Sequence, residues 1–190
     1  MKIIETRIYA GLMILTDYIL LGLLWIIMSL PLLTLIPATC GVFHVLHSWE
    51  EGASGRVLYL FFQGFRRKLL QTSSLSMGYI VFLGTVYLGF SVIAEAGTDL
   101  KMVIGLLLAA VFLVTVFLLR LFYLFTADGN QSLASQLEAA AVQLVVGLPQ
   151  TVGLILTSIL YAWLVYLFPP FLFVLAGGFW KVVYWLAGKN

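Results

Sequence analysis

Long apolar runs separated by short polar segments dominate the sequence, and the first run is interrupted by two prolines. This run covers residues 8–46, where Asp17 is the only charged side chain. As one straight helix it would extend for about 58 Å at 1.5 Å per residue, roughly twice the thickness of the bilayer hydrocarbon. Pro31 and Pro37 divide the run, and proline lacks a backbone donor and disfavours helix in the residue before it. We therefore expect the chain to bend at these two prolines.

Five apolar segments are the candidate membrane-spanning helices: four have at least the roughly 20 residues that a crossing needs, and the fifth is short. Their positions are residues 9–33, 74–94, 102–125, 148–168 and 171–186. A helix over residues 34–49 would be only about 24 Å long, so we expect this arm to be re-entrant or interfacial. The pattern predicts an all-α fold, a polytopic transmembrane helical bundle that forms a single domain over residues 1–190.

Residues 56–71 predict an amphipathic helix before the second span. At 100° per residue its apolar side chains, Phe61 among them, fall within an arc of about 140°. Arg56 and Arg67 lie opposite with two glutamines. A cationic amphipathic helix of this kind lies in the headgroup layer, with its arginines toward anionic lipid headgroups. The alternative is a helix that packs on the protein itself. A second helix that precedes a span is predicted over residues 131–146.

The composition places the chain among integral membrane proteins. Hydrophobic residues make up 63% of the chain and charged residues 9%, whereas about a quarter of the residues of soluble proteins are charged. The net charge of +2 is too small to indicate nucleic-acid binding, and the longest basic block is Arg66-Arg67-Lys68. We expect the lipid bilayer to be the medium around the apolar segments.

Basic residues near the span ends predict the orientation, because cationic loops are retained in the cytoplasm. The basic residues that fall on one side of the membrane are Arg56, Arg66, Arg67, Lys68, Lys181 and Lys189. We expect this side to be the cytoplasm, with the C-terminus inside. Five spans then leave Lys2 and Arg7 outside, whereas a sixth crossing by residues 34–49 would bring the N-terminus back inside.

Asp17 and Arg120 are the two ionisable residues within the predicted spans. A charge at the bilayer centre costs about 2.5–3.5 kcal/mol on insertion scales, so such residues are functional candidates. Three interpretations of Asp17 are open: an interfacial helix cap or anchor, which we favour, a structural ion pair with Arg120, and a proton or substrate role. If the N-terminus lies outside, the Arg120 side chain would instead extend to the cytoplasmic surface.

Four potential metal ligands share one helix face, at intervals of four, three and four residues: Cys40, His44, His47 and Glu51. Thiolate and imidazole are good zinc ligands, but helix of this length covers roughly 16 Å, so at most two neighbours could bind one ion. We expect interfacial histidines here, with no metal and no cofactor. Because the sequence contains no phosphate loop, nucleophile elbow or paired catalytic carboxylates within a span, it predicts a protein without enzymatic activity.

Small and aromatic residues recur where helix packing and membrane interfaces favour them. Small residues four apart allow spans to approach closely, and the pairs are Ser74 and Gly78, Thr85 and Gly89, Gly105 and Ala109, and Gly153 and Thr157. Aromatic belts at opposite membrane surfaces are expected from Trp163 and Tyr166 at one end, and from Trp180, Tyr184 and Trp185 at the other.

Three motifs resemble those of the YesL-like family of bacterial membrane proteins, a domain of unknown function. The first comprises Thr16-Asp17-Tyr18, Trp25, Ser29-Leu30-Pro31, Thr34 and Pro37-Ala38. The others are Phe61, Phe65, Arg66 and Gln71, and Leu148-Pro149-Gln150-Thr151. The resemblance covers residues 16–155, with Gly22 and Lys68 standing where members often have Asn.

The resemblance implies a location in the bacterial cytoplasmic membrane and an accessory role in carbohydrate import, and it brings no established catalytic or binding residues. Our leading hypothesis is a non-enzymatic protein that assists or regulates carbohydrate uptake through contacts with another membrane protein, such as a sugar permease. The alternative is a small transporter of a sugar or other small solute that acts as an oligomer. Its site would lie near the two proline breaks of the first apolar run, at Pro31 and Pro37.

Overall fold

A computed structural model describes residues 2–53, 55–67, 69–95, 100–127 and 133–188. Within these residues the chain forms eight α-helices and one 3₁₀ turn, and no strand. The helices are α1 (Lys2–Ser29), α2 (Leu35–Glu50), α3 (Val57–Arg67), α4 (Leu69–Glu95), α5 (Leu100–Ala127), α6 (Leu133–Val146), α7 (Leu148–Leu167) and α8 (Phe171–Gly188), and the turn is η1 (Leu32–Thr34). The expected all-α polytopic bundle is confirmed.

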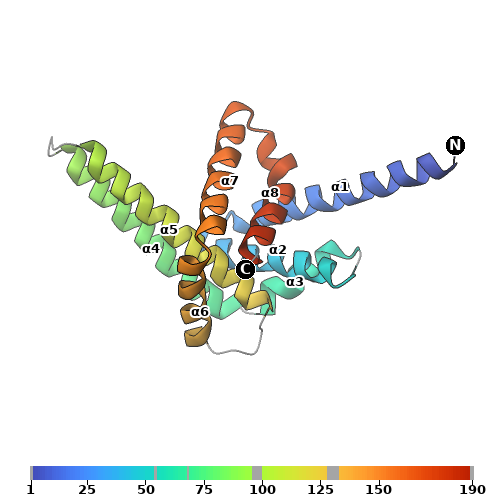
Figure 1. The fold of residues 1–190 in the computed structure, drawn as a ribbon, viewed down its shortest axis with the longest axis horizontal. Helices are drawn as coiled ribbons and strands as arrows, with labels where there is room; N and C mark the ends of the chain where they lie inside the picture. The colour runs from blue at the N-terminus through green and yellow to red at the C-terminus, as the bar shows by residue number, and fades with distance from the viewer. Residues whose placement is uncertain (1, 54, 68, 96–99, 128–132, 189–190) are drawn as a thin grey trace.

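The helices form a central body from which three arms extend (Figure 1). The body contains α2 and α3, with α6 beside its lower part. One arm is the N-terminal part of α1, the second is the hairpin of α4 and α5, and the third is the hairpin of α7 and α8. The hairpin arms carry exposed apolar side chains, among them Val81 on α4, Leu106 on α5 and Val152 on α7.

Helix α2 lies in the interior of the protein. In the window Leu32–Glu50, 61% of the residues are buried, against 6% in the window Thr72–Ser91 of α4. Its buried side chains include Val42, Phe43 and Val45, all fully inaccessible. An apolar helix of this kind can cross a bilayer while the surrounding helices separate it from lipid.

Among the described residues, six helical segments are long and apolar enough to cross a membrane, which makes the chain a multi-pass membrane protein. Five of them correspond to the expected spans, and the sixth is the segment Leu32–Glu50, expected to be re-entrant or interfacial. Helices α1 and α2 also run antiparallel, with Tyr18 beside Trp49 near one end and Trp25 bonded to Thr39 further along. The structure therefore favours six crossings in place of the expected five.

The two prolines of the first apolar run have different effects. Helix α1 ends at Ser29 and the chain turns at Pro31, as expected; the Thr34 hydroxyl lies 2.5 and 2.7 Å from the carbonyl oxygens of Met28 and Pro31. Pro37 lies inside the first turn of α2, where backbone N–H groups have no helical partner, so it causes no break. The second expected bend is thus wrong.

Glycines allow α3 to pack closely on α2. A Cβ on Gly64 would lie 2.5 Å from the Cβ of His44, and one on Gly41 would lie 3.1 Å from the Phe61 ring. Phe61 is fully buried in this contact, so α3 packs on the protein through this part of its apolar face, while Leu58 of the same face stays 51% exposed. Helix α4 begins at Leu69, so it includes the last residues expected in the amphipathic helix.

The close approach of α1 and α8 also depends on glycine. A Cβ on Gly22 would lie 2.8 Å from both the Cβ of Ala176 and the backbone nitrogen of Gly177. By contrast, Gly78, Gly89 and Gly105, three of the glycines expected to mediate packing, have open space at the Cβ position.

Candidate functional site

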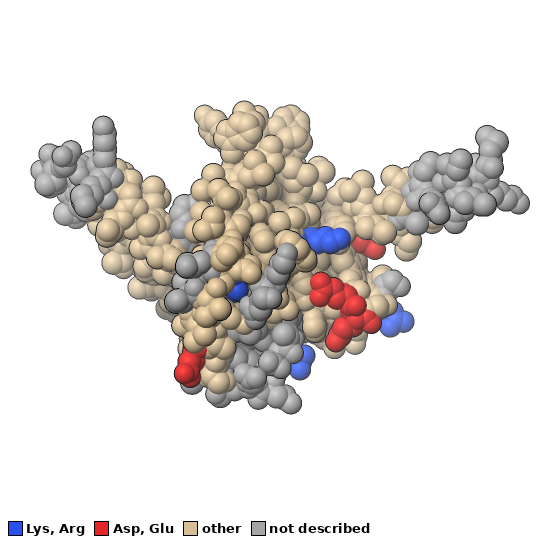
Figure 2. Space-filling view, viewed as in Figure 1, with Lys and Arg blue, Asp and Glu red and all other residues tan. Residues whose placement is uncertain are grey.

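A groove between α1, α2 and α8 gathers charged and aromatic side chains at the C-terminal end of α2. It consists of two adjoining depressions of about 340 and 380 Å³ that share Tyr18, Trp49 and Lys181. The first depression is also lined by Leu46, Glu50, Val182, Tyr184 and Trp185, and the second by Ile14, Asp17, Gly52, Ala53 and Gly55. Figure 2 shows acidic and basic side chains gathered on this flank of the body, below the arm formed by α1.

Aromatic contacts fix the floor of the groove. The Lys181 ammonium lies 5.1 Å from the centre of the Tyr18 ring, a cation–π contact. The ring of Trp49 meets Tyr18 edge-on, with the centroids 5.2 Å apart. Asp17 and Tyr18 are half-buried, whereas Lys181 is exposed. Tyr18 therefore connects the three helices at the point where the two depressions meet.

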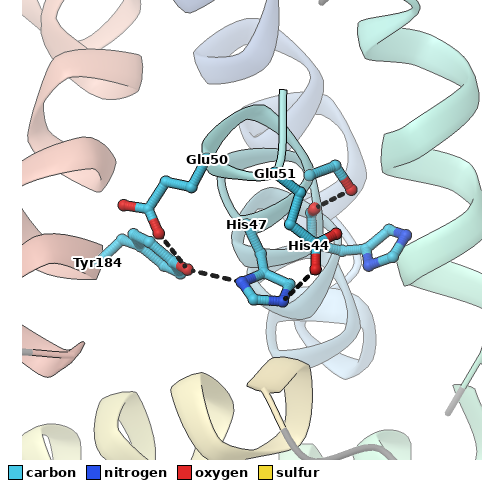
Figure 3. Close-up of polar contacts among 6 residues, drawn as sticks. His44, His47, Glu50, Glu51 and Tyr184 are labelled. Carbon is cyan, nitrogen blue, oxygen red and sulfur yellow. Dashed lines mark hydrogen bonds and ion pairs between the residues drawn. The ribbon is translucent and has the colours of Figure 1, made fainter. Parts of the chain in front are cut away.

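Tyr184 holds the end of α2 in place through two hydrogen bonds (Figure 3). Its hydroxyl donates to Glu50 Oε2 at 3.2 Å, so the 3.1 Å contact with His47 Nδ1 is one in which the imidazole donates. His47 Nε2 lies 3.6 Å from Glu51 Oε1, and this becomes an ion pair when the imidazole is protonated. The network orients the Glu50 carboxylate at the edge of the groove.

The potential metal ligands of α2 do not converge. His44 points away from the Tyr184 side of the helix in Figure 3, and Cys40 is buried. Within the part of the chain that the structure describes, no three His, Cys, Asp or Glu side chains cluster at one point.

Arg120 is buried at the junction of α6 and α7, and its exposed fraction is 0%. Its Nη2 donates to the Gly147 carbonyl at 3.2 Å, and Nε and Nη1 have no partner among the described residues. Gly147 precedes α7, and Pro149 occupies the first turn of that helix, where its missing N–H costs no hydrogen bond. Because the Gly147 backbone lies directly against the guanidinium, the side chain does not extend to the surface.

Two of the interpretations left open for Asp17, the ion pair with Arg120 and the helix cap, do not hold in the structure. Asp17 lines the groove near Trp49 and forms no ion pair with Arg120. It lies in the middle of α1, which begins at Lys2, so it is not a helix cap. Its position near one end of the candidate span Gly11–Ser29 is that of an interfacial side chain.

The other candidate residues lie apart from the groove. Pro31 is exposed at the end of α1, and Thr34 and Pro37 form the entry to α2. Arg66 and Arg67 are exposed on α3, where Arg66 lines a shallow depression with Leu58, Tyr59, Phe62 and Gln63. Lys68 lies outside the described residues.

Residues 18–90 match the model of a family described as a protein of unknown function, DUF624. YesL-like proteins belong to that family, so the resemblance is confirmed. This segment belongs to the DUF624 family. No curated protein and no solved structure matches the chain significantly.

The DUF624 match covers only some of the residues that line the groove. It includes Tyr18, Trp49 and Glu50 from α1 and α2, and it ends within α4, far before Lys181 in α8. Arg120 and Gly147 also lie beyond the matched residues.

Sequence reasoning did not detect the groove, because it used Lys181 only to predict orientation and placed Trp180, Tyr184 and Trp185 in an aromatic belt. The structure buries Trp180 and Tyr184, which are 5% and 3% exposed, and leaves only Trp185 of this group exposed. The sequence did contain a signal for it. Lys181 and Tyr184 are three residues apart and therefore share one helix face, and α2 ends in polar residues that could face them.

Proposed function

We propose that the protein is a non-enzymatic, multi-pass protein of the bacterial cytoplasmic membrane that assists or regulates carbohydrate uptake by binding another membrane protein. The carbohydrate part of this proposal rests on the resemblance to YesL-like proteins. The part that concerns a partner rests on the hairpin of α4 and α5.

The observation that carries the proposal is the open apolar surface of this hairpin. A shallow depression of about 260 Å³ lies between α4 and α5, and its lining residues are Leu83, Val86, Tyr87, Phe90, Ile104, Leu107 and Leu108. Gly84 in α4 and Gly105 in α5 have open space at the Cβ position, so neither glycine is needed for close helix packing within the described part of the chain. In membranes, helices associate through close packing at small residues, so this surface suits a helix of a partner.

The packing of the body supports an accessory role over transport. Transporters bind solute near the membrane midplane, between helices. Here α2 fills the centre, and its neighbours there are apolar: Leu21, Phe61 and Val183 are all fully buried. The charged groove lies at the end of α2.

Helix α3 gives the protein a surface for anionic lipid headgroups. Arg66 and Arg67 are exposed in its last turn, and Leu58 and Tyr59, which are 51% and 63% exposed, line a shallow depression together with Arg66. Apolar and aromatic side chains next to arginines are typical of helices that lie at a membrane surface.

The direct experiment replaces glycines of the hairpin and follows the partner. Gly84→Leu and Gly105→Leu add side chains next in sequence to residues that line the depression, at positions where a Cβ meets open space, and Gly11→Leu on α1, where the Cβ position is also open, is the matched control. We expect a carbohydrate permease subunit to co-purify from native membranes with the wild type and the control, and to be lost from both hairpin variants. Solute flux in energised liposomes that contain only this protein would instead establish the transporter.

A further inference from the structure

Three charged side chains line the groove without neutralising one another. Glu50 borders the first depression, Asp17 the second and Lys181 both, yet none forms an ion pair with another within the described residues. Two carboxylates and one ammonium remain available in a partly enclosed site. Their natural complement is a ligand that carries both a cation and an anion.

The carboxylates are placed to accept hydrogen bonds from an ammonium group. Glu50 is held by the Tyr184 hydroxyl through Oε2, which leaves Oε1 for a ligand. Asp17 borders the second depression on the other side of Tyr18 and Trp49. Aromatic rings next to carboxylates add cation–π attraction for an ammonium.

Lys181 is the group that would bind the anion. Its ammonium is held over Tyr18 and borders both depressions, so an oxyanion bound there shares one depression with Asp17 and adjoins the one that Glu50 borders. The depressions, at about 340 and 380 Å³, have the size of small-molecule sites in general.

The walls of the groove are continuous with surfaces that face lipid. Ile14 on α1 and Val182 on α8 line it and are 58% and 43% exposed. Both belong to helices that are candidate membrane spans, and the groove lies toward one end of each. Acyl chains could therefore leave the site along α1 and α8 while the headgroup stays among the charges.

We propose that this groove binds a phospholipid with a zwitterionic headgroup that carries a primary amine, of the phosphatidylethanolamine class. Its ammonium hydrogen-bonds to Asp17 and its phosphate pairs with Lys181, two side chains that border the same depression, while Glu50 adds negative charge in the adjoining one. The inference goes beyond the proposed function and is independent of any protein partner. The groove and α3 would thus prefer different lipids, since the arginines of α3 favour anionic headgroups.

The test measures lipid binding to the delipidated full-length protein in detergent, with three phospholipids of identical acyl chains that carry ethanolamine, choline or glycerol headgroups. The choline headgroup keeps the charge but has no N–H to donate, and the glycerol headgroup has no ammonium. We expect thermal-shift titrations to show that the ethanolamine lipid binds about tenfold more tightly than the other two. Asp17→Asn and Lys181→Met should each remove this preference, whereas Glu138→Gln on α6 and Arg66→Gln on α3 should keep it.

Three results would overturn the proposal. One is equal binding of the three lipids to the wild type. Another is an ethanolamine preference that persists in both groove variants while their melting temperatures match that of the wild type. The third is full displacement of the lipid by equimolar glycerophosphoethanolamine, which would assign the site to a soluble zwitterion.

Discussion

The backbone of Gly177 in α8 lies directly against the Tyr18 carbonyl in α1, so that a Cβ on Gly177 would overlap the carbonyl oxygen. No side chain fits between the two helices at this point. Lys181 follows one turn later in α8 and therefore lies above the Tyr18 ring. This crossing sets the geometry of the groove.

Gly177→Ala should destabilise the protein, because the added methyl group forces α1 and α8 apart. The neighbouring variant Gly178→Ala is the control, since its Cβ position is open and both changes carry the same gain in helix propensity. We expect Gly177→Ala to lose about 1–3 kcal/mol relative to the control. Thermal denaturation in detergent measures this difference, and equal melting temperatures would show that the crossing is looser than described.

Gly64→Ala should release α3 from α2. Its Cβ would lie 2.5 Å from the Cβ of His44, which belongs to a buried helix and has little room to move. Trypsin should then cleave faster after Arg66 and Arg67, which lie in the last turn of α3. Gly84→Ala on α4 is the control, and an unchanged cleavage rate in Gly64→Ala would refute the close contact.

Arg120→Met should leave stability unchanged or raise it, because an unpaired buried cation costs more than an apolar side chain of similar size. The Gly147 carbonyl would keep its bond from the Thr151 backbone nitrogen at 2.9 Å. Gly147→Ala places a Cβ 2.6 Å from Nη2 and should destabilise by about 1–3 kcal/mol. In the double variant that loss should be partly recovered, because the added Cβ still lies 2.9 Å from the Gln143 carbonyl oxygen; simple additivity of the two melting-temperature shifts would contradict the contact with Arg120.

Tyr184→Phe should destabilise the protein by about 1–3 kcal/mol, because it removes the two hydrogen bonds that join α8 to the end of α2. Tyr166→Phe is the matched control, since that side chain is 85% exposed on α7. Chemical denaturation followed by tryptophan fluorescence measures both variants. Equal effects would mean that the network contributes nothing to stability.

Local chemistry made part of the fold predictable. The turn at Pro31 and the start of α7 at Leu148 follow from proline and its neighbours alone, and the structure has both. Pro37 shows the limit of this reasoning. Pro31 follows the end of α1, whereas Pro37 lies in the first turn of α2. The sequence alone does not tell which of the two prolines falls in the first turn of a helix.

The site was less predictable because it depends on which helix faces meet. Arg120 was expected to pair or to extend outward, but the backbone of Gly147 offers it a carbonyl in the interior. Likewise, Gly22 and Gly177 differ in no way from Gly78 or Gly105 in the sequence, yet only the first two lie at a helix crossing. Residues 16–155, where the resemblance was noted, do not include Lys181, so no motif pointed to the groove.

The topology of α2 can be measured with cysteine labelling. In a Cys40→Ala background, single cysteines are placed next to Lys2 and next to Lys189 and labelled with a membrane-impermeant reagent, in intact cells and in inverted vesicles. If α2 crosses the membrane at the centre of a six-span bundle, both cysteines label only in inverted vesicles. Labelling of the two ends from opposite sides would show that an odd number of helices cross, and the central position of α2 as a span would be wrong.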